Sequence, residues 1–196
     1  FRENGFLPRI IYALPFTSII DQNYDVLNSI LIHLKEYQEN STSYLLKHHH
    51  LTELKNIHFD KVENLPLDKL LLLVESWESE IIVTTFVQLF ETLIGRKNKM
   101  LKKYHNLYGA IILLDEVQTI DIENWSLVRR VLENLAQKAE CYFVLMTATQ
   151  PLIFPKEVAH ELVDNSEEFF GRLNRVKFFY DPTKLQIDEF TDKVIT

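Results

Sequence analysis

The segment Asp115–Gln118 carries the side chains that nucleotide chemistry requires. Asp115, Glu116 and Gln118 directly follow the apolar run Ile111–Leu114 in the order Asp-Glu-Val-Gln. An aspartate at this position can hold Mg²⁺ through its water shell beside the phosphates of a nucleotide. The adjacent glutamate can orient or deprotonate an attacking water. A purely structural alternative stays open, because carboxylates are also common and favourable in the first turn of a helix.

A second polar segment, Thr147-Ala148-Thr149, follows another apolar run further along the chain. Two hydroxyl groups at this place could form hydrogen bonds to the end of the strand that carries Asp115. They could then respond to the state of a nucleotide site. The alternative is an ordinary transition from strand to loop, and the three residues alone do not decide between the two.

Two further groups of hydroxyl side chains stand at the ends of apolar runs. Pro15-Phe16-Thr17-Ser18 follows the run at residues 9–14, and Thr84-Thr85 follows the run at residues 81–83. The hydroxyls of Thr17, Ser18, Thr84 and Thr85 could bind the phosphates of a single nucleic-acid strand without reading its bases. Considered singly, each of them is better interpreted as capping the start of a helix.

Strand-like and helix-like patterns alternate along the chain, and this alternation positions the polar groups. The predicted strands are buried apolar runs at residues 9–14, 81–83, 110–114 and 141–146. The predicted helices have apolar residues at helical spacing over residues 20–34, 86–94 and 128–139. This order predicts an α/β domain with a mainly parallel sheet, in which ligands bind beyond the C-terminal ends of the strands.

Helix ends, the three consecutive histidines, one cysteine and two tryptophans are interpreted as structural features. We expect Thr17 or Ser18 to cap the first helix, Gly95 to end another helix, and His48-His49-His50 to form an exposed polar turn rather than a metal site. Cys141, Trp77 and Trp125 are interpreted as packing residues. The other predicted elements are a short strand at 44–46, a helix at 67–77, a late strand at 176–180 and a helix starting near Leu185.

The composition is that of an ordinary globular domain. The 196 residues are 46% hydrophobic and 25% charged, and no apolar run is long enough to span a bilayer. A single cysteine excludes an internal disulfide and favours a reducing, cytoplasmic setting. The net charge of −7 argues against a large basic surface for nucleic acid, so any such binding would depend on a few loops.

The ordered set of polar segments is more specific than any one of them. Pro-Phe-Thr-Ser, Val-Thr-Thr, Asp-Glu-Val-Gln and Thr-Ala-Thr resemble motifs Ia, Ic, II and III of superfamily-2 helicases. The surrounding sequence resembles the helicase-nuclease of type I CRISPR interference. This similarity runs from about Arg9 to Tyr180, and it is strongest over Ile10–Asn23, His48–Leu51, Leu145–Pro151 and Arg172–Val176.

This resemblance implies a RecA-like, three-layer α/β/α motor domain that uses ATP and Mg²⁺. It implies that Asp115 holds Mg²⁺, that Glu116 activates water, and that Gln118 with Thr147–Thr149 couples the nucleotide to DNA. It further implies that Pro15–Ser18 with Thr84 and Thr85 contact single-stranded DNA. The expected partners are single-stranded DNA and the RNA-guided type I CRISPR surveillance complex, with an HD-type metal nuclease in the same protein and no membrane.

Parts of that family pattern are missing from the sequence. No Gly-x-x-x-x-Gly-Lys-Ser/Thr loop and no His-Asp doublet occur, and the four glycines lie far apart. We therefore expect a fragment with an incomplete N-terminal side, in which residues 1–180 form part of the first motor domain. Residues 181–196 would begin a linker or helix toward a second motor domain. Two alternatives stay open: a degenerate helicase module that only binds DNA or protein, and an RNA helicase fragment, against which Gln118 is weak evidence.

Overall fold

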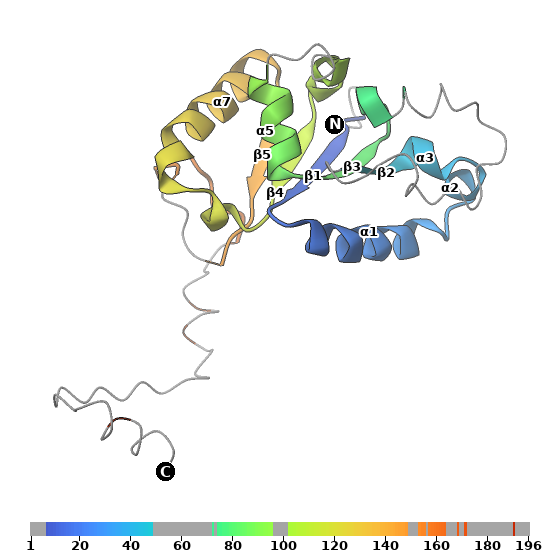
Figure 1. Ribbon diagram of the computed structural model, residues 1–196, viewed down its shortest axis with the longest axis horizontal. Coiled ribbons are helices and arrows are strands. Elements are labelled where there is room, and N and C mark those ends of the chain that lie inside the picture. Colours follow the sequence, from blue (N-terminus) through green and yellow to red (C-terminus); the bar gives the residue numbers. More distant parts are fainter. Residues whose placement is uncertain are drawn as a thin grey trace. The chain divides into compact units, whose positions relative to one another are not determined.

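The computed structural model describes residues 7–48, 72, 74–95, 102–148, 153–155, 157–163, 168, 171 and 190 (Figure 1). The chain divides into two compact units, Phe1–Pro155 and Lys156–Thr196. The sheet and all the site residues described below belong to the first unit. The expected boundary between residues 180 and 181 stays a prediction.

The described part of the chain forms one five-stranded parallel sheet with strand order β2-β3-β1-β4-β5. Parallel neighbours require crossover connections, and helices supply several of them. The α/β prediction with a mainly parallel sheet is confirmed, and the arrangement agrees with a RecA-like domain. The strands are β1 (Ile10–Leu14), β2 (Leu45–His48), β3 (Ile81–Thr85), β4 (Ile111–Leu114) and β5 (Tyr142–Leu145).

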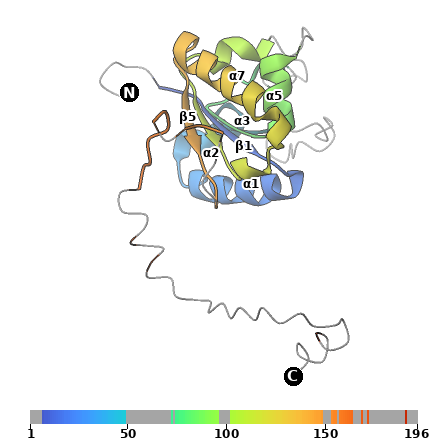
Figure 2. The same cartoon turned by 90° about the vertical axis from the view of Figure 1, so that its left-hand side faces the viewer.

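Helices cover both faces of the sheet, which gives three layers (Figures 1 and 2). One face packs against α5 and α7, and the other face packs against α1 and the Tyr37 side chain of α2. The α-helices are α1 (Thr17–Leu31), α2 (Lys35–Glu39), α3 (Ser41–Tyr44), α5 (Phe86–Ile94) and α7 (Trp125–Lys138). Short 3-10 turns are η3 (His105–Leu107), η4 (Val117–Thr119) and η5 (Ile122–Asn124).

β1 is the central strand, and its alternating side chains reach both cores. Ile11 and Ala13 are buried in the core beneath α5 and α7. Leu14 is buried in the core beneath α1, and Tyr12 packs partly buried against that same core. Successive side chains of a strand point to opposite faces, so one five-residue strand contributes to both layers.

The predicted elements differ from the observed ones mainly at their ends. The helix expected over residues 20–34 ends at Leu31, and Leu34 is exposed. The short strand expected at 44–46 begins at Leu45 and continues to His48, because Tyr44 still belongs to α3. The helix over 86–94 is confirmed. The late strand at 176–180 and most of the helices expected at 67–77 and from Leu185 lie outside the described residues.

The prediction that Thr17 or Ser18 caps α1 is wrong. The extended residue before this helix is Phe16, with φ −124° and ψ 142°, and no side chain makes a capping hydrogen bond. β1 ends at Leu14 and α1 begins at Thr17, so Phe16 occupies the capping position. Thr17 and Ser18 are already inside the helix. Gly95 ends α5 as predicted, but in an extended conformation with φ −65° rather than a left-handed one.

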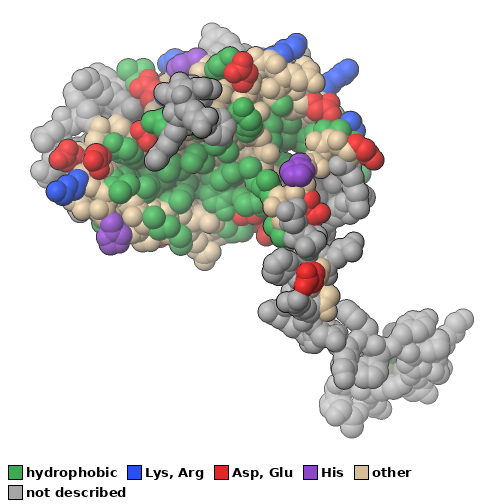
Figure 3. Space-filling model, turned by 180° about the vertical axis from the view of Figure 1, so that it is seen from behind, with side chains coloured by type: hydrophobic (Ala, Val, Ile, Leu, Met, Phe, Trp, Pro, Cys, Tyr) green, Lys and Arg blue, Asp and Glu red, His purple; other side chains and the backbone are tan. Residues whose placement is uncertain are grey.

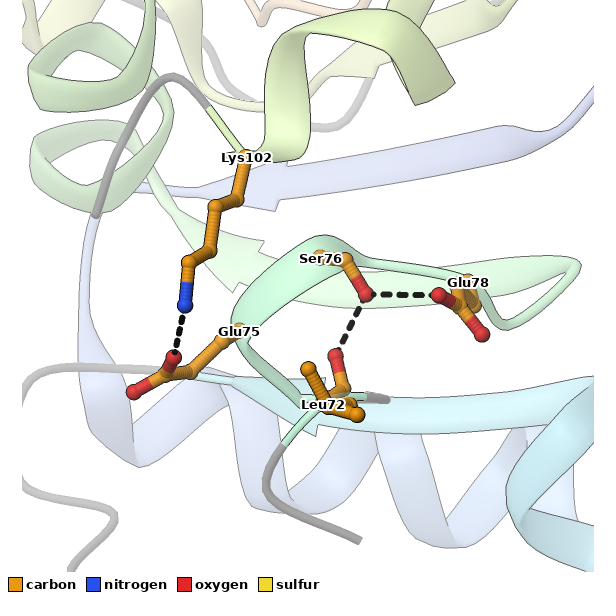
Figure 4. Close-up of polar contacts among 5 residues, drawn as sticks. All are labelled: Leu72, Glu75, Ser76, Glu78 and Lys102. Carbon is orange, nitrogen blue, oxygen red and sulfur yellow. Dashed lines mark hydrogen bonds and ion pairs between the residues drawn. The ribbon is translucent and has the colours of Figure 1, made fainter. Parts of the chain in front are cut away.

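The turn that leads into β3 is fastened by side chains (Figure 4). The Ser76 hydroxyl contacts the carbonyl oxygen of Leu72 and lies 3.0 Å from Glu78 Oε1. Lys102 Nζ pairs with Glu75 Oε2 at 3.0 Å. These contacts fix the start of β3, whose other end carries two of the polar candidates.

The packing roles expected for three side chains are confirmed. Trp77 is fully buried, and Trp125 packs against the same core while its Nε1 donates to the Ile120 carbonyl at 2.7 Å. Cys141 is buried, and its Sγ donates to the Leu107 carbonyl at 3.0 Å. Burial raises the pKa of the Cys141 thiol, which keeps it protonated and poorly reactive.

Figure 3 shows apolar side chains gathered in a band across the face seen from behind. Contiguous apolar surface of this kind commonly marks a place where a domain contacts another domain or protein. Within the described residues, none of the helices is both long and apolar enough to cross a bilayer.

Two leucines of α7 differ in burial, and this difference predicts different losses of stability when each is replaced by alanine. Leu132 is 1% exposed, whereas Leu127 on the same helix is 47% exposed. We expect Leu132→Ala to lower the free energy of unfolding by about 2–5 kcal/mol, because it leaves a cavity against the sheet. Leu127→Ala should cost less than about 1 kcal/mol. Urea denaturation of both variants measures the difference, and equal costs would contradict this packing.

Candidate functional site

The polar strand ends meet where the helices change faces of the sheet. β1 is followed by α1 on one face, and its neighbour β4 is followed by α7 on the other face. In open α/β sheets, ligands bind in the crevice outside such a pair of strands. Asp115 follows β4 and Pro15 follows β1, so the candidate site lies at this switch point.

Asp115 is held by the backbone and by two hydrogen bonds to its carboxylate. Its amide donates to the Ala13 carbonyl at 3.1 Å, which extends the pairing of β1 with β4. Its Oδ1 accepts from the Glu116 amide at 2.9 Å, and its Oδ2 accepts from the Tyr12 hydroxyl at 2.7 Å. The residue is partly buried. Each carboxylate oxygen keeps a lone pair for a further partner, and therefore the group fits a hydrated Mg²⁺.

Tyr12 is a member of the site that the sequence patterns did not single out. Burial, followed by the hydrogen bond to Asp115, raises the pKa of its hydroxyl well above the ordinary value of a tyrosine. The hydroxyl therefore stays protonated and acts as a donor to the carboxylate. The signal in the sequence was a tyrosine inside an otherwise aliphatic strand, where a polar tip needs a partner when it is buried.

Glu116 has a left-handed backbone, with φ 56° and ψ 42°. This conformation is unfavourable for a residue with a side chain and costs roughly 1–2 kcal/mol. The amide and the hydroxyl of Thr119 both donate to the Glu116 carbonyl, at 2.9 Å and 2.8 Å. Together with the bond from its amide to Asp115, these contacts keep Glu116 in its strained position. Strain of this kind is typical of functional sites.

A chain of side-chain hydrogen bonds connects the end of β4 to the end of β5. The Gln118 side-chain amide donates to Glu116 Oε2. The Thr147 hydroxyl donates to Gln118 Oε1 at 2.5 Å. Gln118 therefore uses both ends of its amide, one toward the carboxylate and one toward the segment that follows β5.

Backbone contacts reinforce this connection between the two strands. The Met146 amide donates to the Leu114 carbonyl at 2.8 Å, and the Val117 amide donates to the Met146 carbonyl at 3.2 Å. Val117 is buried in the core beneath α7. Of the three residues expected to couple the site, Thr147 is partly buried and Ala148 is exposed, while Thr149 lies outside the described residues.

The segment Pro15–Ser18 lies at the C-terminal end of β1, beside the carboxylates. Phe16 is 55% exposed and Ser18 is also exposed, whereas Pro15 and Thr17 are partly buried. An exposed aromatic ring and hydroxyl at this edge are available to a ligand.

Thr84 and Thr85 are buried, and their hydroxyls already have partners inside the protein. Thr84 Oγ1 donates to the His48 carbonyl at 2.6 Å. Thr85 Oγ1 accepts from the Gln88 amide at 3.0 Å and so caps α5. Because both side chains are buried, these hydroxyls could reach DNA only after a local rearrangement that exposes them.

An apolar groove lies between α5, α7 and the end of β1. Among the residues that the structure describes, its charged lining residues are Glu91 and Asp121, without a lysine or arginine. A groove with this lining suits apolar or aromatic groups better than phosphates. Its main apolar lining residues are Phe16, Phe86, Val87, Phe90, Ile94 and Leu127.

The exposed turn expected at His48–His50 is not found at its first residue. His48 ends β2, is partly buried, and accepts a hydrogen bond from Trp77 Nε1 through Nδ1 at 2.9 Å. This hydrogen bond and an edge-to-face contact with the Trp77 ring hold the His48 side chain against the buried tryptophan. His49 and His50 lie outside the described residues, within which no cluster of three or more potential metal ligands occurs.

Comparison with known proteins finds a curated relative. The sequence is 33% identical over 172 residues to the CRISPR-associated nuclease/helicase Cas3 of Haloferax volcanii, an alignment that covers 85% of this chain. The chain is a distant homologue of one region of Cas3. It spans 18% of the length of that relative. No family model matches the chain. The predicted resemblance to a helicase-nuclease is thus confirmed for a partial, helicase-like region.

Thr85 caps a helix and Thr17 does not, so replacing them should lower the free energy of unfolding by different amounts. We expect Thr85→Ala to lower the free energy of unfolding by about 1 kcal/mol, because it removes the cap of α5 and leaves the Gln88 amide without its partner. Thr17→Ala changes the first residue of α1, a helix that has no side-chain capping bond, and should cost less than about 0.5 kcal/mol. Thermal or urea unfolding measures both. A larger loss for Thr17→Ala would contradict the observed helix starts.

Proposed function

We propose that this chain is part of the motor of an ATP-dependent, single-stranded DNA translocase that acts in type I CRISPR interference. The observation that carries the proposal is the hydrogen-bonded chain from Glu116 through Gln118 to Thr147, directly beside Asp115. It adds side-chain hydrogen bonds to the backbone bonds that join the ends of two neighbouring strands. The homology to a region of Cas3 supports the same function.

In this proposal Asp115 would hold the Mg²⁺ that accompanies ATP. The bound ion and nucleotide would supply charge neutralisation and the phosphoryl group to be transferred. Glu116 would accept a proton from the attacking water, and the amide of Gln118 would orient its carboxylate. The glycine-rich loop that cradles phosphates would come from sequence outside these 196 residues.

Coupling to DNA would pass through the segment after β5. Gln118 contacts both Glu116 and Thr147, so a change at the carboxylate alters the hydrogen bond that Thr147 makes. Thr147, Ala148 and Thr149 would transmit this change. Pro15, Phe16, Thr17 and Ser18 would contact the DNA strand, with the exposed Phe16 ring available for stacking on a base. Thr84 and Thr85 would join them only after a local rearrangement exposes their buried side chains.

The partners proposed for the whole protein are single-stranded DNA and the RNA-guided surveillance complex, in a cytoplasmic setting. The net charge is −7, and the charged residues in the described lining of the apolar groove are acidic, so this chain offers little electrostatic attraction for DNA. Its own contribution to DNA binding would therefore be weak and indifferent to sequence. Other parts of the protein would supply most of the affinity.

The decisive test compares two variants of the whole protein. Glu116→Gln should lower ATP turnover by ~10²–10⁴-fold and leave nucleotide binding largely intact, because glutamine cannot accept the proton. Asp115→Ala should weaken nucleotide binding as well, because the Mg²⁺ contact is lost. Steady-state phosphate release on single-stranded DNA and a nucleotide titration measure the two effects. Near-wild-type turnover by Glu116→Gln would show that these carboxylates are not the catalytic pair and would favour their structural interpretation, whereas a wild-type protein without ATP turnover would favour a module that only binds.

A second test addresses coupling. Thr147→Val removes the hydroxyl that bonds to Gln118 but keeps the size of the side chain. We expect the stimulation of ATP turnover by single-stranded DNA to fall about fivefold, the equivalent of one lost hydrogen bond of about 1 kcal/mol. Thr92→Val is the matched control, because its hydroxyl donates to the Gln88 carbonyl at 2.8 Å within α5 and not to Glu116 or Gln118. Equal stimulation in both variants would remove Gln118–Thr147 from the coupling route.

A further inference from the structure

We propose that Tyr12 is the positioning residue of Asp115: its hydroxyl holds the carboxylate in the orientation that receives a hydrated divalent cation. The inference rests on the proposed function, since it assigns a support to the cation-holding residue of that same site. Tyr12 lies on the central strand β1, and Asp115 follows the neighbouring strand β4.

The two residues are brought together by strand register. Tyr12 pairs with Leu113 across β1 and β4, and the Ala13 carbonyl accepts from the Asp115 amide at 3.1 Å. Consecutive residues of β1 therefore hold the side chain and the backbone of Asp115. A central strand that is paired on both sides leaves little freedom for this arrangement to shift.

The hydroxyl proton of Tyr12 has two acceptors at unequal distances. Asp115 Oδ2 lies at 2.7 Å and Asn23 Oδ1 lies at 3.4 Å. The Asn23 amide is itself oriented, because its Nδ2 donates to the Ile19 carbonyl at 3.0 Å in the preceding turn of α1. The shorter contact to a charged acceptor is the stronger one, so the proton is directed at Asp115.

The carboxylate of Asp115 is thereby fixed at both oxygens. The Glu116 amide holds Oδ1 at 2.9 Å, and the Tyr12 hydroxyl holds Oδ2. A ligand that is already oriented loses less freedom when the cation binds. Residues that orient metal ligands in this way commonly contribute 10–100-fold to metal affinity.

The test is direct cation binding by the whole protein, with Mn²⁺ in place of Mg²⁺ and a non-hydrolysable ATP analogue present. Electron paramagnetic resonance measures free Mn²⁺. We expect Tyr12→Phe to weaken Mn²⁺ binding about tenfold. Tyr37→Phe is the matched control: its hydroxyl donates to Asn28 Oδ1 at 2.6 Å and is packed against the same α1 face. It should bind Mn²⁺ like the wild type, and circular dichroism should show that both variants melt as cooperatively as the wild type.

Asp115→Ala separates the possible failures. If Asp115→Ala weakens Mn²⁺ binding and Tyr12→Phe does not, the positioning role of Tyr12 is overturned while the proposed site stands. If Tyr37→Phe weakens binding as much as Tyr12→Phe, the effect is a general loss of packing and the role of Tyr12 is again overturned. If Asp115→Ala has no effect, both this inference and the cation site of the proposed function are overturned.

Discussion

The pairing of β1 with a parallel neighbour on each side is the constraint on which the candidate site depends. β3 and β4 fix β1 from opposite directions, and the helices that follow β1 and β4 then cover opposite faces of the sheet. This arrangement opens the crevice at one edge and brings Tyr12 and Asp115 within hydrogen-bonding distance. The pairing of β1 with β4 places the two carboxylates and the glutamine, and the pairing of β4 with β5 places the threonine after β5.

Much of the fold could be predicted because parallel strands buried on both faces are continuous apolar runs. The runs before Asp115 and Thr147 identified two strands and the sheet edge on which their ends meet. The limits of α1 and β2 were less predictable. The start of α1 depends on where β1 ends, and the start of β2 depends on Tyr44 belonging to α3. Hydrophobic periodicity alone does not show either boundary.

The sequence predicted which residues form the candidate site better than it predicted the hydrogen bonds between them. Residue types and motif order indicated Asp115, Glu116, Gln118 and Thr147, which the structure brings together. Thr85 follows the helix-capping alternative, whereas the bond from Thr84 to the His48 carbonyl depends on the pairing of β2 with β3, which no local pattern shows. Tyr12 was missed because its role arises from the register between two strands, and no local pattern in one segment shows such a register.

The alternation of side chains along β1 also limits how this sequence can change during evolution. Tyr12 faces the α1 layer, while its neighbours Ile11 and Ala13 are buried beneath α5 and α7. Point substitutions can be absorbed one layer at a time. The gain or loss of a single codon within β1 would exchange the two layers at once, burying the phenol among aliphatic side chains and leaving the carboxylate after β4 without its donor. In this strand, length should therefore be under stronger selection than the identity of most of its residues.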